Sequence, residues 1–191
     1  MCSSDLRITT AVLGLAGLLA VVAMARAAGV GRRGALLCAV TIAVGPLWGP
    51  LASTYMTDVP AFALQAITVM FAVLSLRRPA VRGAFVASLV AGVVAVSVRQ
   101  YAAVVVIAVL LTHAWVAWRR SDRPALLRVG AAAVATFAVI GALLAWWSTI
   151  PGSLVFAPKV PNGQTVRIAF ESIGDFTRLA GLLLVPVLVW A

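Results

Sequence analysis

Charged residues are scarce in this chain, and acidic ones are scarcer still. Of its 191 residues only 10% are charged, 5 acidic against 15 basic, whereas 63% are hydrophobic and the mean hydropathy is +1.10. A water-soluble globule needs more polar surface than this composition supplies, which excludes that class of protein. The composition therefore predicts an integral membrane protein.

Residues that form disulfides or bind metals are equally few. The chain has 2 cysteines and 1 histidine, with Cys2 near the start and Cys38 inside an apolar run. Two such cysteines provide no disulfide or metal framework, and His113 has no partner at metal-ligand spacing, so we expect a packed or interfacial histidine. We expect no metal site and no cofactor here; a divalent cation would have to be held by carboxylates outside these residues.

The net charge of +10 would suggest nucleic-acid binding in a soluble protein, but the basic residues follow another pattern. Ten of the 15 lie in three alternate loops between apolar runs, namely Arg26, Arg32, Arg33, Arg77, Arg78, Arg82, Arg119, Arg120, Arg123 and Arg128. The positive-inside rule places these loops in the cytoplasm and the other connections outside. We therefore expect no nucleic-acid partner, a lipid bilayer as the surroundings, and a multi-pass protein of the plasma (inner) membrane.

Seven apolar segments are candidate spans, at about 8–25, 35–53, 59–76, 83–98, 101–118, 129–148 and 179–191. A helical span needs about 20 residues, so the fourth is short and the seventh incomplete. Backbone groups in hydrocarbon must bond within the chain, which predicts helices. The predicted fold is an all-α polytopic transmembrane helical bundle of about seven spans. In it Ala87, Ala91 and Ala95 form a small-residue stripe for close helix contact.

Both ends of the chain suggest that it is a fragment of a longer protein. Residues 1–6 match a translated sequencing adapter, and the last residues stop inside an apolar run, so we expect truncation at both ends. We expect four parts: a sequencing-adapter artefact at 1–6, the transmembrane bundle core at 7–148, an external loop at 149–177, and an incomplete last span at 178–191.

The expected external loop contains an amphipathic pattern. Apolar residues recur at helical spacing over 166–176, and Arg167, Glu171 and Asp175 share the opposite face. This spacing predicts a short helix on the membrane surface. Its charges are either an ordinary solvated helix face or part of a loop that binds an acceptor.

Two isolated charges interrupt the apolar pattern. Asp58 separates uncharged runs of 24 and 18 residues, and Arg99, followed by Gln100 and Tyr101, separates the next apolar pair. A charge at the bilayer centre costs on the order of 3 kcal/mol, so both belong at the membrane edge or in a polar cavity. Asp58 is equally suited to cap the helix that starts beside it, and Arg99 to extend its side chain to the interface.

Three short motifs around these charges share a pattern with an enzyme family. They are Gly45-Pro46-Leu47, Thr57-Asp58-Val59-Pro60-Ala61 and Val98-Arg99-Gln100-Tyr101. Over about residues 8–118 the chain resembles the membrane-embedded GT-C glycosyltransferases, which use polyprenyl- or dolichyl-phosphate sugars and include protein mannosyltransferases and lipid A aminoarabinose transferases. The last two motifs also resemble the dolichyl-phosphate-glucose glucosyltransferases. The resemblance implies a GT-C-like core and sugar transfer from a polyprenyl phosphate to an acceptor hydroxyl at the external membrane face.

The resemblance also implies roles for the isolated polar residues. Such a transfer needs a carboxylate near the acceptor hydroxyl and positive groups at the departing phosphate. Asp58 would be catalytic, and Arg99, Gln100 and Tyr101 would bind the donor phosphate. Family members carry a further acidic group in their first external loop, which this sequence lacks, so we expect the catalytic base outside these 191 residues and the fragment itself to be inactive.

Two functions of other classes fit the same charges. In a membrane transporter, Asp58 and Arg99 would bind substrate or a coupling ion. In a noncatalytic membrane scaffold, helix capping and interfacial placement would account for every charge.

Overall fold

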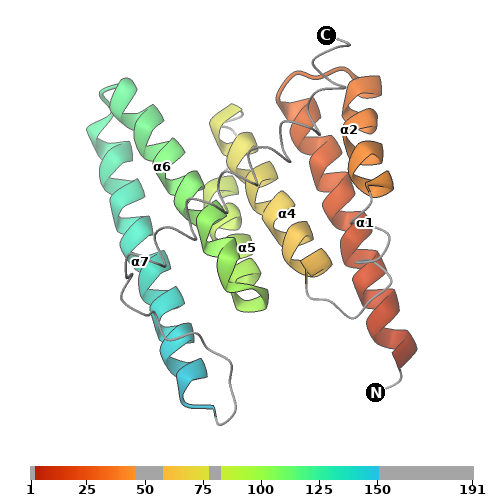
Figure 1. Ribbon diagram of the computed structural model, residues 1–191. Coiled ribbons are helices and arrows are strands. Elements are labelled where there is room, and N and C mark those ends of the chain that lie inside the picture. Colours follow the sequence, from red (N-terminus) through yellow and green to blue (C-terminus); the bar gives the residue numbers. More distant parts are fainter. Residues whose placement is uncertain (1–2, 46–57, 78–82, 151–191) are drawn as a thin grey trace, which may run out of the picture. The chain divides into compact units, whose positions relative to one another are not determined.

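The computed structural model describes residues 3–45, 58–77 and 83–150, and all the regular structure in these ranges is helical. The elements are α1 (Ser3–Ala27), α2 (Arg32–Val44), α4 (Asp58–Arg77), α5 (Ala84–Val98), the 3-10 turn η1 (Gln100–Ala102), α6 (Ala103–Arg119) and α7 (Arg123–Ser148) (Figure 1). The chain divides into two compact units, Met1–Trp147 and Ser148–Ala191, and the described helices belong to the first as far as Trp147. The predicted all-α class is confirmed for the described ranges.

Four helices, not seven, are long and apolar enough to cross a membrane in the described part of the chain: Ile8–Ala27, Asp58–Arg77, Gln100–Arg119 and Arg123–Ser148. At a rise of about 1.5 Å per residue, α2 and α5 extend only about 20 and 22 Å, against roughly 30 Å of hydrocarbon. The predicted seventh span, 179–191, lies outside the described residues. The expectation of about seven spans is thus wrong for the described ranges, which hold four candidate spans and two shorter helices.

The predicted second span, 35–53, is too long, and the helix ends earlier than predicted. The helix α2 stops at Val44, and Gly45 has an extended conformation with φ −56° and ψ 142°. Gly45 precedes Pro46, and the ring of a proline disfavours the helical conformation of the residue before it. Local backbone chemistry therefore ends this helix inside an apolar run.

The predicted sixth span, 129–148, starts too late. The helix α7 begins at Arg123, within the arginine-rich stretch. The Asp122 carboxylate accepts a hydrogen bond of 2.9 Å from the backbone N–H of Ala125, and Pro124 occupies the first turn. A capping carboxylate followed by proline starts a helix irrespective of hydropathy, which explains the earlier boundary.

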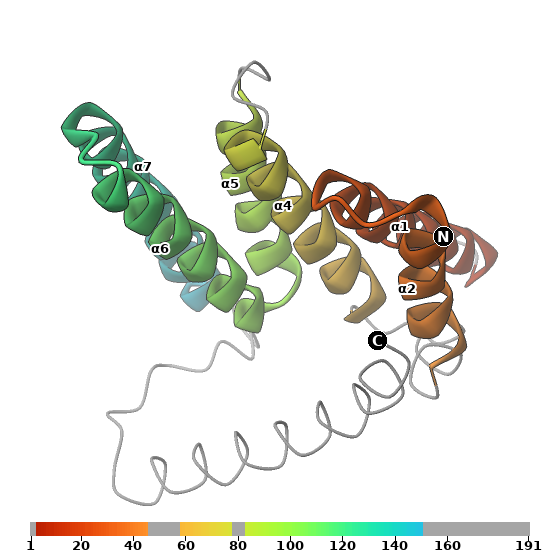
Figure 2. The ribbon, with the colours of Figure 1, turned by 90° about the horizontal axis from the view of Figure 1, so that it is seen from above.

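Three of the long helices run in the same direction. At the start of α4, Asp58 meets Arg99 and Tyr101 just ahead of α6, and near its end Ser75 meets His113 of α6. The helices α4 and α6 are therefore parallel, with α5 joining them, and α4 packs between α1 and α5 (Figures 1 and 2).

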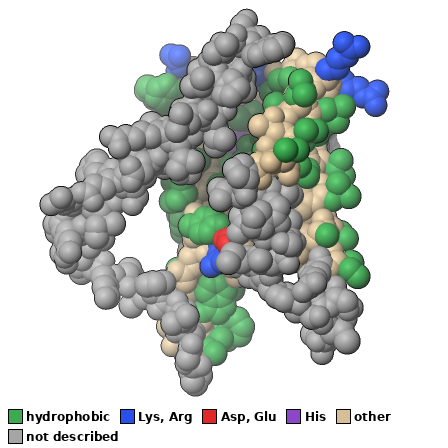
Figure 3. Space-filling model, turned by 45° about the vertical axis from the view of Figure 1, so that its right-hand side comes forward, with side chains coloured by type: hydrophobic (Ala, Val, Ile, Leu, Met, Phe, Trp, Pro, Cys, Tyr) green, Lys and Arg blue, Asp and Glu red, His purple; other side chains and the backbone are tan. Residues whose placement is uncertain are grey.

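The helix α1 follows the same direction as α4. Gly17 lies against Ala63, while Ala20 and Val21 cluster with Ala66 further along both helices. The last turns of α1, α4 and α6 therefore share one end, and each carries an arginine, namely Arg26, Arg77 and Arg119. On the face in Figure 3, basic side chains gather at one end, and an acidic side chain lies beside a basic one well away from them.

The helices meet through small side chains and turn many large apolar ones outward. Ala61, Ala63 and Ala95 are fully buried, whereas Leu15 is 59% exposed and Val134 72% exposed. A soluble protein buries its large apolar residues, but between helices in lipid small residues permit the close packing that holds them together. This distribution agrees with a membrane environment.

The small-residue face of α5 is offset from the predicted stripe. Ala95 is fully buried, but Ala87 and Ala91 are only half-buried, and the buried face instead continues through Ser88 and Gly92. A Cβ on Gly92 would lie 2.6 Å from Cγ2 of Val106, so no side chain larger than hydrogen fits there without movement. The predicted stripe through Ala87 and Ala91 is thus one residue away from Ser88 and Gly92, which lie on the face in closest contact with neighbouring helices.

Candidate functional site

Asp58, Arg99 and Tyr101 form a polar cluster where α4 begins and α6 is about to begin. Nη2 of Arg99 donates a hydrogen bond of 3.3 Å to Oδ2 of Asp58, and the hydroxyl of Tyr101 donates one of 3.2 Å to Oδ1. Nε of Arg99 also lies 3.2 Å from Oδ1. The carboxylate thus has a guanidinium and a phenol as partners.

The backbone between α5 and α6 positions two members of this cluster. The helix α5 ends at Val98, and Arg99 has extended angles of φ −147° and ψ 122° before η1 begins. The N–H of Arg99 still bonds to the Ala95 carbonyl at 2.9 Å, and its carbonyl accepts from Ala102 at 3.0 Å. One extended residue, held on both sides, lets the chain reverse while Arg99 and Tyr101 both reach Asp58.

The cluster is partly open to solvent. The side chain of Asp58 is 29% exposed and that of Arg99 is 41% exposed. Nε of Arg99, by contrast, is shielded, and although it lies within ion-pair distance of Oδ1, it has no hydrogen bond within the described residues. Nη1 makes no hydrogen bond with a described residue either. Among the described residues, Nη1 is therefore the guanidinium nitrogen that is left to donate to a further anionic group.

The other predicted site residues have different outcomes. Gln100 lies in η1 beside the cluster, and its half-buried side chain forms no hydrogen bond with the described residues. The hydroxyl of Tyr101 is engaged with Asp58, so binding a phosphate would require it to change partner. Arg167, Glu171 and Asp175 lie outside the described residues. The roles assigned to all of these residues stay predictions.

A second polar contact, which the sequence did not suggest, joins α4 to α6 near their other ends. Nε2 of His113 lies 2.7 Å from the hydroxyl of Ser75, and Nδ1 lies 2.9 Å from the Val109 carbonyl. The ring of Phe85 packs against the imidazole with centroids 4.5 Å apart. His113 is a packed residue, as expected, but its hydrogen bond to another helix has no local signal, because Ser75 is 38 positions away in the sequence.

Within the described ranges, no three His, Cys, Asp or Glu side chains group as ligands for a metal ion. Comparison with models of protein families, with curated proteins and with solved structures finds no match to this chain. No family is thereby identified, and the likeness to GT-C glycosyltransferases stays a hypothesis based on its motifs.

Proposed function

We propose that this chain, within a longer membrane protein, takes part in transferring a sugar from a polyprenyl-phosphate donor to an acceptor hydroxyl. The observation that carries the proposal is the cluster of Asp58, Arg99 and Tyr101. It combines a carboxylate, a phenol and a guanidinium whose Nη1 has no hydrogen-bond partner among the described residues, at one end of three long apolar helices. These are the chemical groups that such a transfer requires.

In the proposed reaction, the acceptor oxygen forms a bond to the anomeric carbon of the sugar. The bond from that carbon to the phosphate oxygen breaks, and polyprenyl phosphate leaves with the bonding electrons. The hydroxyl proton passes to a carboxylate of the longer protein, outside these 191 residues, while Asp58 accepts hydrogen bonds from the acceptor or sugar hydroxyls and orients them. Arg99 binds the departing phosphate, because a guanidinium stays charged and offers paired donors to phosphate oxygens.

The position of the cluster also supports this proposal. A polyprenyl-phosphate sugar keeps its hydrocarbon tail in the membrane and its charged head at the surface, so its enzyme needs polar groups at the ends of apolar helices. Asp58 is the first residue of α4 and Arg99 precedes η1, whereas Arg26, Arg77 and Arg119 lie in last turns at the opposite end. By the positive-inside rule, the cluster faces the extracytoplasmic side.

The experiment measures sugar transfer by the full-length protein in membrane vesicles. The donors are polyprenyl phosphates that carry radiolabelled mannose, glucose or aminoarabinose, and the vesicles supply the acceptor. With the donor that supports turnover, Arg99→Ala should lower the rate by about 10²- to 10³-fold, the usual effect of removing a charge-stabilising donor. Asp58→Asn should lower it by at least about 10²-fold.

The control is Arg77→Ala, which removes the same side chain from the other end of α4. It should leave the transfer rate within a factor of about two, because a surface position away from the site contributes little. Full activity of Arg99→Ala and Asp58→Asn at normal protein levels would overturn the proposal. Uptake of substrate into the vesicles without formation of a glycosidic bond would replace it by the transporter hypothesis.

A further inference from the structure

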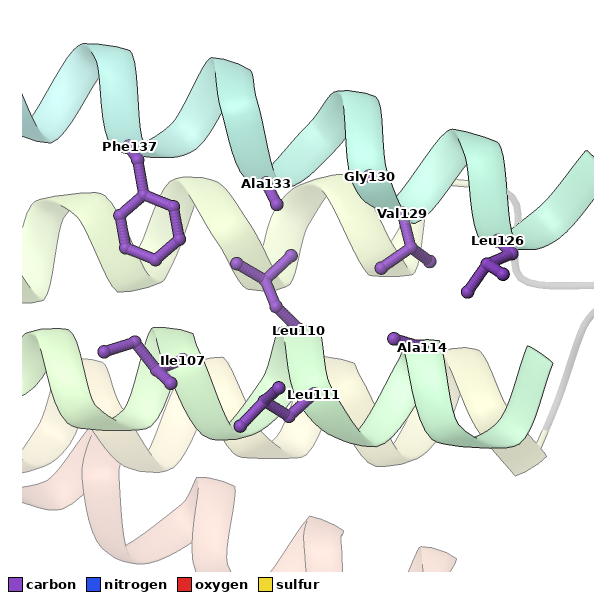
Figure 4. A pocket seen from close by; sticks show the side chains of 9 residues that line it. All are labelled: Ile107, Leu110, Leu111, Ala114, Leu126, Val129, Gly130, Ala133 and Phe137. Atoms are coloured by element: carbon purple, nitrogen blue, oxygen red, sulfur yellow. The ribbon is translucent and has the colours of Figure 1, made fainter. Parts of the chain in front are cut away.

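An apolar groove runs between α6 and α7. Its volume is about 320 Å³, and nine residues line it: Ile107, Leu110, Leu111, Ala114, Leu126, Val129, Gly130, Ala133 and Phe137 (Figure 4). Every one of them is apolar or glycine, and they belong to two helices long enough to cross a membrane. From Leu126 to Phe137 the groove extends about 16 Å along α7, which is half of the roughly 30 Å hydrocarbon core. Its length therefore matches one leaflet.

A second pocket of about 270 Å³ lies at the turn between the same helices, and its lining is more polar. Its walls are Ala117, Trp118, Ser121, Asp122, Arg123 and Leu126. Leu126 lines both cavities, so the polar pocket adjoins the end of the apolar groove nearest the turn. Together they form a site with an apolar body and a polar head.

The head of this site is strongly basic. Arg119, Arg120, Arg123 and Arg128 lie on or beside the turn, against the single acidic residue Asp122. The Asp122 carboxylate is already engaged, because its Oδ1 accepts a hydrogen bond from the Ala125 N–H. Arg119 stacks over Trp115 at 5.5 Å, and Nε of Arg128 bonds to the Pro124 carbonyl. Of the four arginines, Arg123 is the one that lines the pocket itself.

We propose that the α6–α7 site binds an anionic phospholipid of the leaflet on the arginine-rich side. One acyl chain lies in the apolar groove, the phosphate binds to Arg123 beside the Ser121 hydroxyl, and Trp118 packs at the level of the headgroup. The charge selects an anionic lipid, because the surplus of arginines over carboxylates attracts a phosphate that no headgroup cation neutralises. The length and lining of the groove select a lipid tail. This site is distinct from the Asp58 cluster and independent of the function proposed for it.

The experiment reconstitutes the 191-residue chain in nanodiscs of equal parts phosphatidylcholine and phosphatidylglycerol. After extraction into mild detergent, mass spectrometry of the intact protein measures which lipid it retains. Phosphatidylglycerol should be retained in preference, and Arg123→Gln should lower that preference about fivefold, the effect expected for one basic residue near a lipid phosphate. Arg32→Gln, an equal charge change at the start of α2, is the control and should leave the preference unchanged.

The groove is tested by filling it. A Cβ at Gly130 meets no atom within 4 Å, and the same holds for Gly141 on the same helix, but only Gly130 lines the groove. Gly130→Leu should therefore lower lipid retention severalfold, whereas Gly141→Leu should leave it unchanged. A second measurement leaves the groove unchanged. The fluorescence of Trp118 is obtained by subtracting the emission of the Trp118→Phe variant from that of the original chain. Brominated phosphatidylglycerol should quench this fluorescence more than brominated phosphatidylcholine does.

Four results would overturn the proposal. They are equal retention of the two lipids, an effect of Arg32→Gln as large as that of Arg123→Gln, loss of retention in Gly141→Leu, and equal quenching by both brominated lipids. A photoreactive residue at position 111 gives a further check, because Leu111 lines the groove. It should crosslink to lipid, and a crosslink to residues 151–191 would show that the groove is occupied by the chain itself.

Discussion

Arg99 donates a hydrogen bond of 3.3 Å to Asp58 across 41 positions in the sequence. Each is the single charge between two apolar segments, so each would be costly to bury alone. Their contact therefore explains how two isolated charges are accommodated at the ends of α4 and α5. It also leaves a question that experiment can answer, namely whether the pair serves stability or chemistry.

The stability contribution of this pair should be small. A double-mutant cycle of Asp58→Asn and Arg99→Gln should give a coupling free energy of about 0.2–1 kcal/mol, because both side chains are partly exposed. Thermal unfolding in detergent, followed by tryptophan fluorescence, measures it. A coupling several times larger would show that the pair mainly holds α4 against the start of α6, and losses of activity in these variants would then report unfolding rather than chemistry.

The two ends of α7 should lie on opposite sides of the membrane. In a chain with Cys2→Ser and Cys38→Ser, an impermeant maleimide added to intact cells should label Ile150→Cys. It should label Ser121→Cys only after permeabilisation, because the positive-inside rule predicts that the arginine-rich turn faces the cytoplasm. Both native positions are exposed, so each introduced thiol is accessible. Labelling of both from the same side would show that α7 does not cross, and the reverse pattern would contradict the predicted orientation.

The fold class and the four long helices could be predicted because they depend on local properties. Hydropathy locates a span, and the need for internal backbone hydrogen bonds makes it a helix. Hydropathy predicted the helix ends less well. Gly45-Pro46 ends α2 inside an apolar segment, and Asp122-Arg123-Pro124 starts α7 ahead of one. These signals are also local, so greater attention to capping and proline would have found them.

The contacts between helices were harder to predict. The isolation of Asp58 and Arg99 singled them out, because an unpaired charge in a membrane demands a partner. Ser75 and His113 gave no such signal, since each occurs alone in an apolar helix and their meeting depends on the register of α4 against α6. The stripe on α5 was misplaced for the same reason: several faces of a helix rich in alanine and glycine look alike until a neighbour selects one.

The contact of α5 with α6 should depend on the absence of a side chain at Gly92. Gly92→Ala should destabilise the protein by about 1–3 kcal/mol, because the added methyl overlaps Val106, which is fully buried and stiff. Adding Val106→Ala should recover part of that loss, and Gly141→Ala, in open space, should cause none. Thermal unfolding of the original chain and the three variants provides the measurement. If Gly92→Ala alone were neutral, the two helices would have to lie further apart.

The hydroxyl of Ser75 should stabilise the packing of α4 against α6 through His113. The Val109 carbonyl can only accept, so Nδ1 of His113 carries a hydrogen, and Nε2 depends on Ser75 for its partner. Ser75→Ala leaves that nitrogen without this partner and should lower the free energy of unfolding by about 0.6 kcal/mol, and by no more than about 1.7, the range for polar contacts between membrane helices.

A matched control separates this contact from the serine itself. Oγ of Ser97 lies 2.7 Å from the carbonyl three residues earlier, much as Oγ of Ser75 lies 2.8 Å from its own, but the side chain of Ser97 is exposed on α5. Ser97→Ala should therefore change stability less than Ser75→Ala. Nitrogen NMR of the single histidine gives a second measurement, since only Ser75→Ala should shift the Nε2 resonance. An unchanged resonance together with equal stability of the two variants would mean that the hydrogen bond between α4 and α6 does not form.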